Sequence, residues 1–265
     1  MMHSLFTKTL FDKRWFMIGW SFGIILMAWM VIIFFPSLAQ SFDMSEISKK
    51  LPEQLQGLLG DVSAFSNIDG YITSQLYDIR LALFFLLMGL LLANSLTVTE
   101  EDQGKIRTLT ATALSRGRIL WEKWLAGVLI MGLAALATGV GVYLGVISIG
   151  EEFHHTLIGQ LSLMTWIFGI TALTIPMMIG FATGSKAITM PIGLIVTIGS
   201  FILTTFGKNI DWLEQPERAS LMHYFDPSLV QKSGLQLDHI SILAGITLIM
   251  LAVGWLSFRL RDLRA

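Results

Sequence analysis

Six long apolar runs constrain the fold of this chain more than any other feature. An α-helix rises ~1.5 Å per residue, so about 20 apolar residues cross a ~30 Å hydrocarbon core. Within that core every backbone polar group needs an internal partner, which favours helices. We therefore predict an all-α, polytopic membrane protein with six transmembrane helices in a single domain over residues 1–265. The spans lie at about residues 15–35, 81–98, 125–149, 157–183, 187–206 and 240–258.

Composition agrees with this prediction. The chain is 54% hydrophobic and 14% charged, with a mean hydropathy of +0.67. A soluble domain needs more charge to solvate its surface. The apolar run at residues 15–35 exceeds the usual ~7 to 15 residues of a signal peptide, so we expect an uncleaved first span. Leu5, Phe6, Leu10 and Phe11 ahead of it indicate a short interfacial helix.

The distribution of Lys and Arg predicts the orientation. With the N-terminus inside, the inner segments hold 12 of the 18 Lys and Arg residues and the outer segments hold the other 6. The positive-inside rule then places both termini and the segment 99–124 in the cytoplasm. The loops 36–78 and 207–239 are expected outside the cytoplasm.

The segment 99–124 is a charged island between the second and third spans. Thr99 precedes Glu100, Glu101 and Asp102, a pattern typical of a capped helix start. Ile106, Leu109 and Ala113 continue at helical spacing, and Ser115 is placed to cap the next helix. We predict a short helix and a turn outside the bilayer.

The island resembles the corresponding segment in membrane subunits of ABC-2 type ABC transporters. That family carries a pattern of the form Glu-Glu-x-x-Gly-Thr-Ile-Glu-x-Leu-x-x-x-Pro-x-Ser-Arg, followed by a lysine. The matching residues are Glu100, Glu101, Gly104, Ile106, Leu109, Ser115, Arg116 and Lys123. Arg107 and Ala113 depart from the pattern, where the family usually has Glu and Pro. Segments 221–227 and 258–263 resemble two further short motifs of the family.

The resemblance implies an N-in/C-in, type V exporter-like transmembrane domain. It implies that two copies of an ABC ATPase subunit dock on the island, and that the eight matching residues couple ATP hydrolysis to transport. A second permease copy or a paralogue would complete the transporter in a bacterial-type plasma (inner) membrane. The substrates it implies are drugs, antibiotics, peptides, lipids or similar molecules moved outward.

Several activities are disfavoured by the residues themselves. No Gly-x-x-x-x-Gly-Lys-Ser/Thr loop occurs, so ATP would act through a partner and this chain is expected to bind no cofactor. The predicted spans contain no Asp, Glu, Lys or Arg, which argues against proton or sodium coupling. There is no cysteine, and His154 and His155 are adjacent, an unfavourable spacing for a metal site. We expect no catalytic activity from the chain alone, the lipid bilayer as its surroundings, and no nucleic-acid partner.

Two alternatives stay open. The chain could be a non-transporting membrane anchor or sensor in a multiprotein complex, or an ion-independent facilitator or intramembrane enzyme. The glycine pairs Gly141/Gly145 and Gly180/Gly184 permit close helix approach, either within the bundle or at a subunit interface. Pro176 and Pro191 are expected to bend the fourth and fifth spans.

Overall fold

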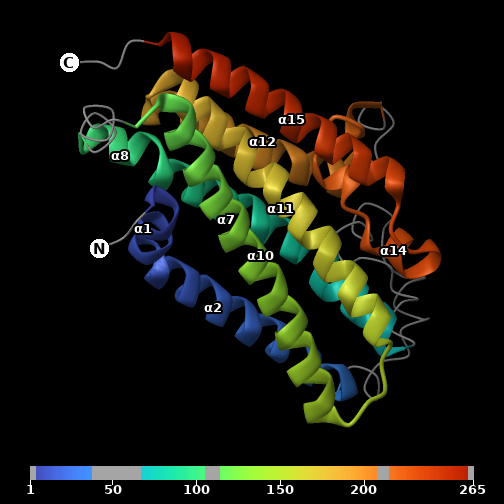
Figure 1. The fold of residues 1–265 in the computed structure, drawn as a ribbon. Coiled ribbons are helices and arrows are strands. Elements are labelled where there is room, and N and C mark those ends of the chain that lie inside the picture. The colour runs from blue at the N-terminus through green and yellow to red at the C-terminus, as the bar shows by residue number, and fades with distance from the viewer. Residues whose placement is uncertain (1–3, 38–66, 105–113, 208–214, 262–265) are drawn as a thin grey trace.

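The computed structural model describes residues 4–37, 67–104, 114–207 and 215–261, which are almost entirely helical (Figure 1). Six helices in these ranges are long and apolar enough to cross a membrane, confirming the number of spans. No strand occurs in the described ranges. The elements are α1 (Leu5–Asp12), α2 (Arg14–Ile33), α6 (Ile68–Ile72), η2 (Thr73–Leu81), α7 (Ala82–Leu96), α8 (Val98–Asp102), α10 (Arg116–Ile149), α11 (His155–Thr183), α12 (Lys186–Phe206), η4 (Met222–Tyr224), α14 (Pro227–Ser233) and α15 (Leu237–Leu260).

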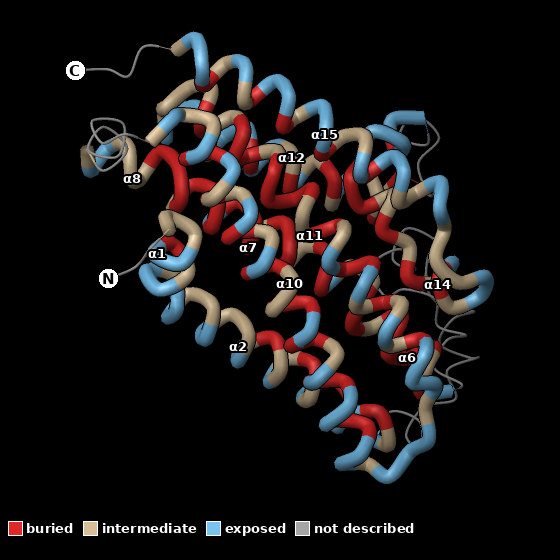
Figure 2. The backbone as a smooth tube through the Cα atoms, viewed as in Figure 1, coloured by how far each residue is buried: buried red, intermediate tan, exposed pale blue. Residues whose placement is uncertain are grey.

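The bundle is built around α7, α10 and α11. Helix α11 packs against α7, α10, α12 and α15, while α10 also packs along α2. These central helices carry most of the buried residues, whereas α2, α12 and α15 turn much of their surface outward (Figure 2). Because the outward faces are apolar, the periphery suits contact with lipid.

The second span begins much earlier than the sequence indicates. Its helix runs without a break from α6 through the π-helical η2 into α7, so residues 68–78, expected in an outer loop, are helical. Asn67 caps this helix, its side-chain oxygen accepting from the backbone N–H of Gly70 at 2.7 Å. Tyr71, Leu76 and Tyr77 of this helix are buried in the hydrophobic core, although the residues between them in the sequence are mostly polar.

The glycine pair in α10 packs within the chain. A Cβ atom on Gly141 would lie 2.9 Å from backbone atoms of Ile25, and one on Gly145 would lie 2.9 Å from the side chain of Ile32. Such distances leave room only for glycine. The interpretation of this pair as a packing feature of the bundle is therefore confirmed.

Residues 215–234 fold back over one end of the bundle. The hydroxyl of Ser220 donates to the carbonyl of Ser200 at 2.9 Å, and Phe225 packs on Phe168 with ring centroids 4.8 Å apart. Asp226 caps α14, and Pro227 occupies its first turn. Residues 215–234 of the predicted outer loop thus form a structured cap.

Candidate functional site

One end of the bundle gathers both chain ends, α1, α8, the start of α10, the α11–α12 turn and the last turn of α15 (Figure 1). We call it the terminal end. It contains most of the predicted coupling residues. The opposite end, with α6, α14 and the α10–α11 connection, is called the distal end.

A fully buried lysine joins α8 to α10. The Nζ atom of Lys123 donates to the carbonyl of Leu96 at 2.7 Å and to Oε2 of Glu100 at 2.5 Å. The Lys123 side chain has no exposed surface, and that of Glu100 is 15% exposed. A buried charge is tolerated when it is paired and hydrogen-bonded. Helix α8 is therefore fixed to α10 through this pair.

A second ion pair joins α8 to α15. The Nη2 atom of Arg261 donates to both carboxylate oxygens of Glu101, at 2.5 and 2.6 Å. The guanidinium group lies against Gly184, which ends α11 with φ 60°. A side chain there would collide with Arg261 as well as strain the backbone. Glycine at this position lets α8, α15 and the α11–α12 turn meet.

Arg116 ties the start of α10 to the end of α15. Its Nη1 atom donates to the carbonyl groups of Phe258 at 3.1 Å and Arg259 at 3.2 Å, and also to that of Arg261. These are the free carbonyl groups that the end of a helix leaves unpaired, so a cation suits the position. Ser115 caps α10, as predicted, by accepting from the backbone N–H of Arg118 at 3.3 Å.

Helix α1 docks at the same end. The backbone N–H of Phe6 donates to Oε2 of Glu122 at 2.9 Å, and Nε of Arg118 donates to Oε1 of the same carboxylate at 2.6 Å. Nζ of Lys13 donates to the carbonyl of Ser95 at 3.1 Å. The short helix expected before the first span exists, and it is attached to α10 and α7.

The helix cap predicted at Thr99 is wrong. Helix α8 begins at Val98, with only Thr97 between it and the end of α7 at Leu96, so Thr99 lies inside its first turn. Thr97 occupies the N-cap position without a side-chain capping bond, because its hydroxyl donates back to the carbonyl of Ala93 at 2.7 Å. Gly104 follows α8 with φ 70°, a left-handed conformation that favours glycine.

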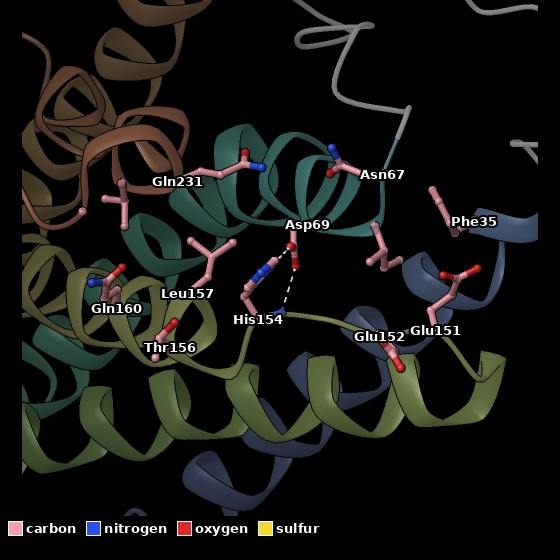
Figure 3. A pocket seen from close by; sticks show the side chains of 13 residues that line it. Phe35, Asn67, Asp69, Glu151, Glu152, His154, Thr156, Leu157, Gln160 and Gln231 are labelled. Atoms are coloured by element: carbon pink, nitrogen blue, oxygen red, sulfur yellow. Dashed lines mark hydrogen bonds and ion pairs between the residues drawn. The ribbon is translucent and has the colours of Figure 1, made fainter.

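The distal end carries a polar cavity of about 940 Å³ (Figure 3). Within it, Nδ1 of His154 lies 2.5 Å from Oδ2 of Asp69, which ties the start of α11 to α6. The hydrogen bond and the charge of Asp69 raise the pKa of His154 above its ordinary value. No group of His, Asp and Glu residues suited to a metal ion occurs in the described ranges.

Comparison with known proteins identifies the family of this chain. The sequence model of the family described as multidrug efflux system permease Rv1217c, C-terminal domain, matches residues 10–259. The chain belongs to this permease family. Among curated proteins, none matches its sequence.

Within this permease domain, the structure brings together five of the eight predicted coupling residues: Glu100, Glu101, Ser115, Arg116 and Lys123. Gly104 adjoins them, and Ile106 and Leu109 lie outside the described residues. Sequence reasoning missed the partners Arg261 and Glu122. Arg261 belongs to the terminal motif at residues 258–263, but nothing in that motif indicates which carboxylate it binds.

Proposed function

We propose that this permease domain is the membrane subunit of an ATP-driven exporter of the ABC-2 type. Family membership supports efflux, and the match of residues 100–123 to the ABC-2 pattern supports a separate ATPase. The 12 to 6 division of Lys and Arg supports a cytoplasmic terminal end. The chain itself would bind no cofactor and catalyse no reaction.

The observation that carries the proposal is the attachment of α8 to two spans besides its own. Glu100 reaches α10 through Lys123, and Glu101 reaches α15 through Arg261. A displacement of α8 by a closing ATPase dimer would therefore move α7, α10 and α15 together. Rigid, contiguous contacts of this kind carry motion from a docking site into a bundle.

The same contacts divide the residues at the end of α8 into paired and exposed ones. Glu100 and Glu101 are committed to partners inside the chain, whereas Asp102 and Gln103 are exposed. We expect Asp102 and Gln103 to contact the partner, and the two glutamates to transmit the motion inward. This division of roles separates docking from transmission.

The proposed assembly contains two ATPase subunits and two permease domains, the second being another copy or a paralogue. It would lie in a bacterial-type plasma (inner) membrane and move a drug, antibiotic, peptide, lipid or similar molecule outward. The outward-facing apolar surfaces of α2, α12 and α15 leave room for a second permease domain as well as lipid.

Reconstitution tests the proposal. Proteoliposomes holding the permease domain with the ATPase subunit that copurifies with it should move ethidium when ATP is supplied. The permease domain alone should hydrolyse no ATP and carry no flux under a proton or sodium gradient. Gradient-driven flux by the domain alone would overturn the proposal, and an intact complex that moves no substrate of a broad panel would favour an anchor or sensor.

A further inference from the structure

An apolar groove of about 650 Å³ runs between α10 and α11. This volume lies within the ~300–1,000 Å³ range of pockets for drug-sized ligands. Leu136 and Leu163 on its walls are 64% and 41% exposed. These exposed wall residues lie on two helices that are long and apolar enough to cross a membrane, so we expect the groove to face the hydrocarbon rather than the interior of the bundle. Other walls are formed by Leu129, Leu133, Val140 and Ile158.

Small residues make the groove deep. Gly132, Gly139 and Gly159 line it, and a Cβ atom on Gly159 would meet no atom within 4 Å. Trp166 closes one part of it, and its Nε1–H is already satisfied by the carbonyl of Val128 at 3.0 Å. The indole therefore presents an apolar surface, which suits an alkyl chain.

Three rings stand at the distal mouth of the groove. The centroid of Phe153 lies 4.5 Å from that of His155 and 6.0 Å from that of Tyr143, and the Tyr143 and His155 centroids are 6.3 Å apart. Grouped aromatic faces attract quaternary ammonium ions through cation–π contacts. The mouth thus combines an apolar slot with rings suited to an organic cation.

The local charge favours a cation over an anion. The C-terminus of α10 and the N-terminus of α11 meet at this mouth, and their partial charges have opposite sign. The net local charge is therefore set by the side chains. The exposed Glu151 and Glu152 directly precede Phe153 in the chain and line the neighbouring polar cavity. The described distal segments 67–80, 150–156 and 215–239 hold seven Asp and Glu residues against three Lys and Arg residues.

We infer that the groove binds single-chain cationic amphiphiles, with the alkyl chain between α10 and α11 and a quaternary ammonium head among the three rings. This deepens the proposed function by naming a substrate class, and its role in export rests on that function. Binding of the amphiphile does not rest on the proposed function, because it needs neither ATP nor the ATPase.

Photolabelling of the permease domain alone tests the binding. The probe is an alkyltrimethylammonium with a diazirine in its tail, applied to the domain in nanodiscs of phosphatidylethanolamine and phosphatidylglycerol. Labelled peptides should come from α10 and α11. Dodecyltrimethylammonium should displace the label, whereas the uncharged dodecyl maltoside should compete far less.

Two substitutions locate the site. Gly159→Leu fills the groove and should weaken labelling at least about tenfold, because each buried methylene contributes ~0.8 kcal/mol and a tenfold change is ~1.4 kcal/mol. Gly245→Leu on α15 is the matched control, since a Cβ there also meets nothing within 4 Å. Phe153→Ala should weaken cation binding roughly two- to fivefold, as expected for an exposed cation–π contact.

Labelling spread evenly over all helices, or equal effects of Gly159→Leu and Gly245→Leu, would overturn the inference. Equal competition by dodecyl maltoside would show that the groove has no preference for a cation and is an ordinary lipid-facing surface. None of these outcomes depends on transport, so failure here is distinguishable from failure of the proposed exporter function.

Discussion

The ammonium group of Lys123 lies 2.5 Å from the carboxylate of Glu100, with the lysine side chain fully buried. The two residues belong to different helices, α10 and α8. Breaking a buried pair by removing one partner leaves a buried charge uncompensated, which costs more than the pair itself contributes.

Glu100→Ala should therefore destabilise the permease domain by about 3–5 kcal/mol. Thermal unfolding of the purified domain in detergent measures this. Asp102→Ala, on the same short helix but exposed, is the control and should change stability by less than about 0.5 kcal/mol. The double variant Glu100→Met/Lys123→Met should recover much of the loss. Equal stability of the Glu100 and Asp102 variants would show that the buried pair is unimportant.

The pair between Glu101 and Arg261 should behave as one unit. Glu101→Gln and Arg261→Gln should each reduce ATP-dependent transport, and the double variant should be little worse than either, with a coupling energy of about 0.5–3 kcal/mol in a double-mutant cycle. Membrane abundance of each variant is the control. Additive losses would mean that the contact between α8 and α15 does not act in coupling.

Substitution of Gly104 tests the left-handed backbone conformation that follows α8. A non-glycine residue at φ 70° pays roughly 1–2 kcal/mol, so Gly104→Ala should lower stability by about that amount, and Gly104→Asn by less. Gly19→Ala is a matched control, because Gly19 lies inside α2 with open space around it. A Gly104→Ala variant as stable as the Gly19→Ala variant would contradict the left-handed geometry.

The sequence predicts the six spans because length and hydropathy are local properties, and each long apolar run can satisfy its backbone only as a helix. The sequence places the start of the second span too late, because the polar residues Thr73, Gln75 and Asp78 indicate a loop. These polar residues share a helix with buried Tyr71 and Tyr77, and only tertiary packing reveals that burial.

For the coupling residues, the sequence predicts the residues themselves but not their partners. The motif predicts which residues gather in the island, but Glu100 pairs with a residue 23 positions away and Glu101 with one 160 positions away. Such partners depend on how α10 and α15 pack, which no short motif encodes. The Thr99 cap fails because α8 follows α7 almost directly, so the helix start shifts to Val98.

His154 gives a pH-dependent prediction. The hydrogen bond that the His154 ring donates to the Asp69 carboxylate raises the pKa of His154 above the ordinary 6.5. A raised pKa means that the pair stabilises the contact between α6 and α11 fully below about pH 6.5, and that this contribution is lost as pH rises through the folded-state pKa. Asp69→Asn should lower the pKa of His154 toward 6.5 in an NMR titration of labelled histidines. A pKa unchanged by Asp69→Asn would contradict the pairing.

The most direct test of the central claim asks whether the exposed tip of α8 touches the ATPase. The chain has no cysteine, so Asp102→Cys introduces one site for a thiol-directed crosslinker, and Ser233→Cys on α14 provides an exposed control at the distal end. In membranes containing the copurifying ATPase subunit, we predict that Cys at position 102 crosslinks to that subunit and Cys at position 233 does not. Crosslinking at position 233 alone, or at neither position in an intact complex, would contradict it.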